Sequence, residues 1–159
     1  MINRRTSWRR ILPLAAAFAL AVGLTAHVAC KSESLLKGCS AVLAVDKAAY
    51  AKGEPVRLQL TLVNDEEDLV TLTFASSQIY DFWILDAGGS EVWRWSSSRV
   101  FATVITHIDL LPGAAAAYSE IWDQLNGDKA AVEAGTYTVH AAVAIADPPE
   151  IDPVTISIQ

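Results

Sequence analysis

The stretch YDFWILDAGGSEVWRWSSSRVF, residues 80–101, carries six of the thirteen aromatic residues of this 159-residue chain. Two aromatic-rich runs flank a turn built on Gly88 and Gly89, which predicts a β-hairpin with a four-residue loop at 87–90. The expected cross-strand pairs are Leu85 with Val92, Ile84 with Trp93 and Phe82 with Trp95. Phe82, Ile84, Trp93 and Trp95 then share one face, which we predict to be core because such pairs bury large apolar surfaces.

The opposite face of the same hairpin carries Trp83, whose burial the predicted register does not require. Arg94 lies beside it, so the two side chains can form a cation–π stack at the surface, or Trp83 can lie beneath the SSSR loop at 96–99. An exposed tryptophan also suits stacking on a sugar ring. We take six residues as candidates for an interaction site: Trp83, Arg94, Ser96, Ser97, Ser98 and Arg99.

From position 40 onward apolar and polar residues alternate with a period of two in several segments, at 56–62, 70–74, 137–143 and 154–158. Strict alternation is typical of half-buried antiparallel strands, and the segments are separated by short turn sequences rich in Gly, Pro, Asn and Asp. We count about eight or nine strands. The sequence therefore predicts an all-β fold, an immunoglobulin-like antiparallel β-sandwich over residues 40–159.

The phrase EAGTYTV at 133–139 resembles the tyrosine corner of immunoglobulin-like sandwiches, in which a tyrosine hydroxyl bonds back to nearby backbone. Tyr137 is the tyrosine of this motif. Val139 stands where immunoglobulin domains carry a cysteine, so packing alone has to hold the two sheets together.

The N-terminus predicts export. Four arginines (Arg4, Arg5, Arg9 and Arg10) precede an apolar run at 11–24, the layout of a secretory signal, and we assign residues 1–29 to a signal peptide. An uncleaved membrane anchor is the alternative, if the apolar run extends to Ala29. The protein is thus expected in the cell envelope.

Two cysteines follow the leader. The sequence AHVAC resembles a bacterial lipoprotein cleavage site, so we predict that Cys30 is lipidated and that residues 30–39 form a short tether to a membrane. A disulfide between Cys30 and Cys39 is the alternative, since an exported protein permits one. In that case the protein is soluble, secreted or periplasmic.

Charge and motifs exclude several classes of function. All 18 acidic residues but only 8 of the 12 Lys and Arg residues follow position 29, a balance of −10 that disfavours nucleic acid as a partner. The chain lacks a nucleophile elbow, a phosphate-binding glycine loop and a zinc-protease helix motif. The acidic run at 65–68 lacks the spacing of a calcium loop. We therefore predict a monomer without enzymatic activity, cofactor or metal.

The segment TLTFASSQIYDFWILDAGGSEVWRWSSSRVF resembles the signature of the BsuPI family of intracellular proteinase inhibitors, and the resemblance extends over about residues 41–145. It implies an immunoglobulin-like sandwich and inhibition of a serine protease of subtilisin type. The matched positions are expected to form the framework of the fold: Gln78, Tyr80, Asp81, Phe82, Trp93, Trp95, Ser96, Phe101 and Trp122.

Three functions fit these observations. The first is a protease inhibitor, whose inhibitory loop is either Ser96–Arg99 or the proline-rich ADPPEIDP segment at 146–153. The second is a carbohydrate-binding module built around Trp83. The third is an envelope accessory or scaffold domain that binds another protein through a sheet edge. The family resemblance favours the first.

Overall fold

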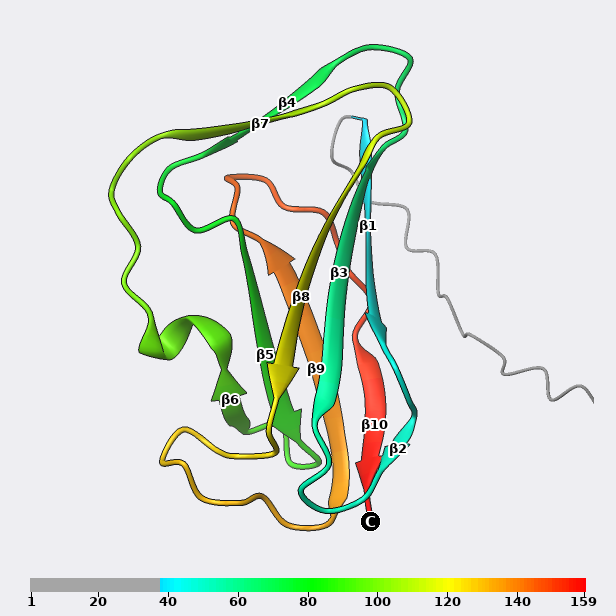
Figure 1. The fold of residues 1–159 in the computed structure, drawn as a ribbon, viewed down its shortest axis with the longest axis vertical. Helices are drawn as coiled ribbons and strands as arrows, with labels where there is room; N and C mark the ends of the chain where they lie inside the picture. The colour runs from blue at the N-terminus through cyan, green and yellow to red at the C-terminus, as the bar shows by residue number, and fades with distance from the viewer. Residues whose placement is uncertain (1–37) are drawn as a thin grey trace, which may run out of the picture.

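Alternation along the long strands directs every second side chain into one shared core. The computed structural model describes residues 38–159, which form ten strands and one short 3₁₀ helix (Figure 1). In chain order these are β1 Cys39–Val45, β2 Ala49–Tyr50, β3 Val56–Asn64, β4 Val70–Phe74, β5 Tyr80–Asp86, β6 Glu91–Arg94, η1 Trp95–Ser98, β7 Thr106–Leu110, β8 Ala115–Trp122, β9 Gly135–Val143 and β10 Val154–Ile158.

Two sheets pack face to face. A three-stranded sheet has the order β1-β3-β8, and a five-stranded sheet has the order β2-β10-β9-β5-β6. Figure 1 shows the first sheet in front of the second, with the separate pair β4-β7 crossing above them. All pairings are antiparallel except that of β2 with β10. The predicted all-β, immunoglobulin-like sandwich is confirmed.

The core lies between these sheets and is made by the inward half of each alternating strand. Strand β3 shows the pattern most clearly, because Val56, Leu58, Leu60 and Leu62 are at most 1% exposed and the residues between them face outward. The fully buried side chains of the opposite sheet come from β2, β5, β9 and β10: Tyr50, Phe82, Ile84, Val139 and Ile156. The four segments predicted to be strands from their alternation, at 56–62, 70–74, 137–143 and 154–158, are strands β3, β4, β9 and β10.

The aromatic hairpin is formed by β5 and β6, with one change in register. Ile84 pairs with Trp93 as predicted, but a bulge follows, so that Leu85 pairs with Glu91 instead of Val92. Strand β6 ends at Arg94, and Trp95 starts the 3₁₀ helix instead of pairing with Phe82. Trp95 is nevertheless buried, whereas Trp93 is only half-buried, so the predicted core face is correct except at Trp93.

Asn64 fixes the point at which β3 ends and the chain continues into β4. Its side chain is fully buried, and its Nδ2 donates to the carbonyl oxygens of Asp68 (2.9 Å) and Leu110 (2.8 Å). Its Oδ1 accepts from the backbone N–H of Glu66 at 2.9 Å. A buried amide of this kind has to be hydrogen-bonded, and here it joins the two turns that carry the β4-β7 pair.

The tyrosine corner is present. The Tyr137 hydroxyl donates to the backbone carbonyl of Glu133 at 2.7 Å, and the ring packs edge-on against Trp122. This bond ties the start of β9 to the preceding loop, as the motif predicts.

Cys39 opens β1 and points into the core, where it is 3% exposed. Burial raises the pKa of its thiol, and the nearby carboxylates of Asp65 and Glu66 add to the shift. The predicted signal peptide at 1–29, Cys30 with its lipid or disulfide, and most of the tether lie outside the described residues. No helix within 38–159 is long and apolar enough to cross a membrane.

We predict that Trp95→Ala lowers the free energy of unfolding by roughly 3–5 kcal/mol, the range for a large aromatic side chain truncated in a core. Trp95→Phe is the matched control. It keeps a ring against Tyr80, which stacks on Trp95 at 4.6 Å, and removes an indole N–H that is buried without a partner in the described domain. Urea unfolding measures both variants. Equal losses for Phe and Ala would contradict a packing role for the ring.

Candidate interaction surface

The carboxylate of Asp81 joins β5 to the 3₁₀ helix. The side chain is 12% exposed, and its Oδ1 accepts from the backbone N–H of Phe82 (2.9 Å) and of Ser96 (3.1 Å). Its Oδ2 accepts from the Ser96 hydroxyl at 2.7 Å and from Arg94 Nη1 at 2.9 Å. Four donors thus satisfy a largely buried charge, and they fix where β6 stops and the following turn begins.

A second group of contacts packs the end of that turn onto the sandwich. The Arg99 guanidinium lies over the Trp95 ring at 4.2 Å and 3.8 Å from Glu120 of β8. Glu120 also accepts a 2.7 Å hydrogen bond from the Tyr80 hydroxyl. The Tyr80 ring in turn stacks on Trp95, the ring that Arg99 covers. Burial, followed by the bond to Glu120, raises the pKa of Tyr80. Arg99 is therefore held by a ring and a carboxylate at once.

Beyond Arg99 the chain runs as a loop from 99 to 105, which Figure 1 shows as a long arc standing away from both sheets. Its middle is tied down at Ala102, whose carbonyl accepts from the Ser77 N–H (3.0 Å) and whose N–H donates to the Ser77 hydroxyl (2.9 Å). Between these two anchors Val100 is 99% exposed. Val104 and Ile105, which are 53% and 66% exposed, continue the apolar surface.

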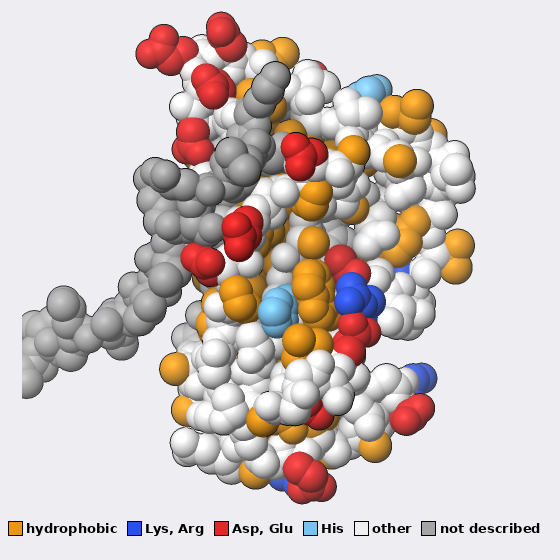
Figure 2. Space-filling model, turned by 180° about the vertical axis from the view of Figure 1, so that it is seen from behind, with side chains coloured by type: hydrophobic (Ala, Val, Ile, Leu, Met, Phe, Trp, Pro, Cys, Tyr) orange, Lys and Arg blue, Asp and Glu red, His pale blue; other side chains and the backbone are white. Residues whose placement is uncertain are grey.

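Trp83 lies on the outer face of the five-stranded sheet, as predicted. It is the middle member of a row across three strands, because it pairs with Arg94 of β6 on one side and with His140 of β9 on the other. Arg94 lies over the indole at 4.8 Å, and the imidazole stacks on it at 5.2 Å with an interplanar angle of 11°. Figure 2 shows histidine, hydrophobic and basic side chains following one another across this face. Both faces of the indole are therefore occupied.

Burial in this stack lowers the pKa of His140. The neutral imidazole is the form that stacks best on an indole whose other face already carries a cation. The row thus acts as a packed strip of the sheet surface and leaves no open ring face for a sugar.

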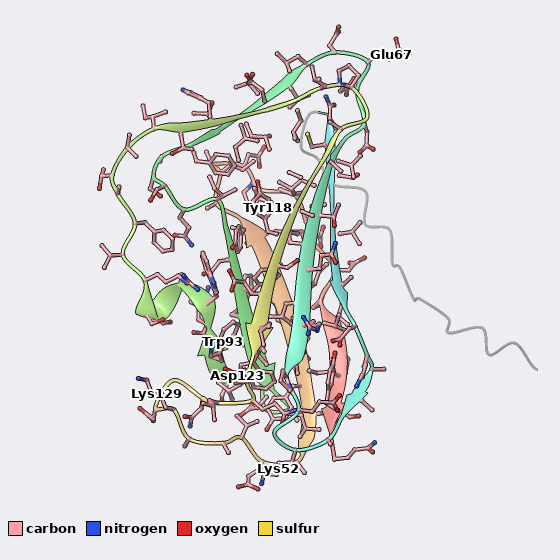
Figure 3. All side chains as sticks on the ribbon, viewed as in Figure 1. Lys52, Glu67, Trp93, Tyr118, Asp123 and Lys129 are labelled. Atoms are coloured by element: carbon pink, nitrogen blue, oxygen red, sulfur yellow. The ribbon has the colours of Figure 1, made fainter. Side chains whose placement is uncertain are left out.

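A cleft of about 560 Å³ lies on the other side of β6, between the 3₁₀ helix and the segment 121–129. Trp93 and Trp122 line it, together with Ser97, Ser98 and several charged side chains. Figure 3 labels three residues along it, Trp93, Asp123 and Lys129. Trp93 is half-buried because one side of it faces this cleft instead of the core.

The structure thus divides the predicted site residues among three places. Arg94, Ser96 and Arg99 belong to the contacts around Asp81 and Trp95, together with the framework residues Tyr80, Phe82 and Phe101. Ser97 and Ser98 face the cleft, as do Trp93 and Trp122. Trp83 lies on the outer sheet face. Gln78 precedes β5, and its Nε2 donates to the Tyr80 carbonyl at 3.3 Å.

In the candidate loop at 96–99, residues 96–98 belong to the 3₁₀ helix, and Arg99 lies over the Trp95 ring with its side chain 47% exposed. Three exposed apolar residues follow it, Val100, Val104 and Ile105. The proline-rich alternative at 146–153 connects β9 to β10, and its Pro149 is buried. Val100, Val104 and Ile105 were not among the predicted site residues, because large apolar residues in a segment without strand alternation form no recognisable motif.

Residues 38–159 bring no three His, Cys, Asp or Glu side chains together in an arrangement that could hold a metal ion. The exposed apolar residues of the loop 99–105 lie beside the 3₁₀ helix in the chain.

Comparison with known proteins identifies one family. The family model for BsuPI, described as intracellular proteinase inhibitor, matches residues 43–147. No curated protein matches the sequence. The matched segment contains the aromatic hairpin, the 3₁₀ helix and the exposed loop.

Solved structures give more distant similarities. A β-glucosidase from Erythrobacter marinus is 12% identical over 76% of this chain and 15% of its own, with a TM-score of 0.46. An alkylpurine DNA glycosylase from Pseudomonas fluorescens is 15% identical over 77% of this chain and 30% of its own (TM-score 0.48). A CARDB domain from Pyrococcus furiosus is 9% identical over 76% and 87% (TM-score 0.42). This chain spans less than a third of the first two, and none of the three carries an argument about function.

We predict that Asp81→Ala lowers the free energy of unfolding by roughly 2–4 kcal/mol, because Ser96 and the backbone donors lose their acceptor and each buried unpaired group costs about 1–3 kcal/mol. Glu91→Ala is the matched control, since Glu91 binds the same Arg94 from an exposed position. Its cost should stay within about 1 kcal/mol. Chemical denaturation compares the two, and equal costs would show that Asp81 acts only as a surface ion-pair partner.

Proposed function

This chain belongs to the BsuPI family of intracellular proteinase inhibitors, and from this premise we propose that it binds and inhibits a serine proteinase of subtilisin-like type in the cell envelope. Membership of an inhibitor family implies a proteinase partner and a role without catalysis of its own. The serine class of the target and the envelope location are parts of our proposal.

The observation that carries the proposal is the loop 99–105. A segment that blocks a proteinase has to be exposed, and it also has to be held, because a flexible segment loses more conformational entropy on binding and is cut as a substrate. Val100 is 99% exposed between two anchors, the packed Arg99 and the Ala102–Ser77 bonds. The loop combines both properties, and a flanking surface of about 800 Å² on each partner would complete a stable interface.

The charge of the chain supports a target with a basic rim. Beyond position 29 the balance is −10, so the chain as a whole carries a negative field. Such a field accelerates encounter with a positive surface and does so less as salt screens it. Association should accordingly slow as the ionic strength rises.

A second candidate function rests on strand β8. It pairs with β3 on one side only, so its other backbone edge is open over Ala115–Trp122. An open edge of this length can take up a strand from another protein, which suits an envelope accessory or scaffold domain. The carbohydrate-binding alternative receives no comparable support, since both faces of Trp83 are occupied.

We predict that the full-length protein, purified in mild detergent, inhibits a subtilisin-like proteinase, and that replacing residues 100–105 with Gly and Ser abolishes the inhibition. Replacing 146–148 in the same way is the matched control, because these residues of the proline-rich segment are also exposed and lie in another connection. Titration of peptidase activity measures both. Inhibition that survives the first replacement but not the second would assign the site to the proline-rich loop. A full-length protein that inhibits no serine proteinase and stays uncut would favour the scaffold function.

We predict that Cys30 carries the membrane anchor. Cys30→Ser should move the protein from the membrane pellet to the soluble envelope fraction and lower its mature mass by that of the lipid. Cys39→Ser is the control and should leave both unchanged, since Cys39 lies in the core. A Cys30→Ser protein that stays in the pellet would favour an uncleaved anchor within residues 1–29.

A further inference from the structure

We propose that Val100 is the side chain that enters the primary specificity pocket of the target proteinase, so that this pocket is apolar and sized for a β-branched aliphatic residue. The inference rests on the proposed inhibitory function and names the class of its target. Arg99, the basic residue next to it, has a different task, which is to hold the loop in place.

Exposure singles out Val100 within the loop. Its side chain is 99% exposed, whereas the residues on either side contact the domain: the half-exposed Arg99 lies over Trp95, and the Phe101 ring lies 5.8 Å from the same indole. The two neighbours thus share one aromatic support and turn the side chain between them outward. An aliphatic side chain presented in this way gains free energy only when a partner covers it.

Arg99 is engaged by the domain itself. Its guanidinium lies 4.2 Å from the Trp95 ring centroid, and one of its nitrogens lies 3.8 Å from Glu120. Entry into an acidic pocket would require breaking both contacts and would leave Glu120 with only its bond from Tyr80. A proteinase that selects basic residues therefore finds this arginine already bound.

The backbone around Val100 suits substrate-like binding. Arg99 has an extended conformation (φ −118°, ψ 153°), and its N–H donates to the Ser96 carbonyl at 3.0 Å, which fixes the start of the exposed segment. The two bonds between Ala102 and Ser77 fix its end. Within residues 38–159 the backbone N–H and carbonyl of Val100 form no hydrogen bond, so both are free to pair with the edge of a partner strand.

The apolar surface continues on one side only. Val104 and Ile105 follow after the turn at Ala102, where the Val104 N–H donates to the Ala102 carbonyl at 3.0 Å. They can cover the rim of an apolar cleft once Val100 is seated. The exposed apolar surface of Val100, Val104 and Ile105 thus suits a proteinase whose subsites are apolar.

The test compares single substitutions in the full-length protein, purified in mild detergent, against three proteinases whose primary pockets are small and apolar (elastase type), broad and apolar (subtilisin type) and acidic (trypsin type). We expect the unchanged protein to inhibit the first, the second or both, and not the third. Val100→Ala should weaken inhibition roughly 10–200-fold, the range for apolar groups removed from such a pocket. Val100→Asp should abolish it, and Val100→Arg should transfer it to the trypsin type.

Two further variants separate the roles. Leu69→Asp adds the same charge at a distant exposed position and should leave inhibition unchanged. Arg99→Ala frees the loop without altering the pocket residue, so the protein should keep its preference among the proteinases and be cleaved faster within residues 99–105. A change of preference with Arg99→Ala would assign the pocket to Arg99 and overturn the inference.

The outcomes also distinguish this inference from the function on which it rests. Inhibition that is lost on replacing residues 100–105 but retained in Val100→Asp would leave the inhibitory loop in place and refute Val100 as the pocket residue. Inhibition that survives both changes would place the site elsewhere. Failure of the unchanged protein to inhibit any of the three at tens of micromolar would refute the proposed function and the inference together.

Discussion

The carboxylate of Asp81 lies almost out of water, and a charge in that position has to be surrounded by donors. The chain supplies them by stopping β6 at Arg94 and turning at once into a 3₁₀ helix, which brings the Ser96 amide and hydroxyl to the two carboxylate oxygens. The turn buries Trp95, and both Arg99 and Phe101 contact the Trp95 ring. The geometry of the exposed loop therefore derives from one buried charge.

Much of the fold could be predicted because one side of each long strand faces water and the other faces the core. Strands β3, β4, β9 and β10 show this alternation in the sequence, and the Tyr137 corner has a local motif. The bulge after Ile84 could not be predicted in the same way, since the closing loop at 86–90 depends on the Asp86 side chain, which accepts from the Gly88 and Ser90 amides. Those two bonds shift the register by one residue.

The candidate site was predicted less completely, for a physical reason. Alternation in the sequence predicts which side chains of a strand share a face. It does not predict which residues of a loop are left exposed, without contacts to the rest of the domain. Arg99 was a predicted site residue, and one of the two groups that contact it, Glu120, lies twenty-one residues further along the chain. Val100 belongs to no sequence pattern, and its exposure between two residues that contact Trp95 becomes visible only in the structure.

The Tyr137 corner has a consequence for where such a protein can work. Immunoglobulin domains connect their two sheets with a disulfide bond. Here the packed core and the hydrogen bond from the Tyr137 hydroxyl to the Glu133 carbonyl stabilise the sandwich, and the one cysteine within residues 38–159 is a buried free thiol. Folding of residues 38–159 therefore does not depend on disulfide formation or on the redox potential of the compartment. The same framework can therefore be built in a reducing compartment or in an oxidising one.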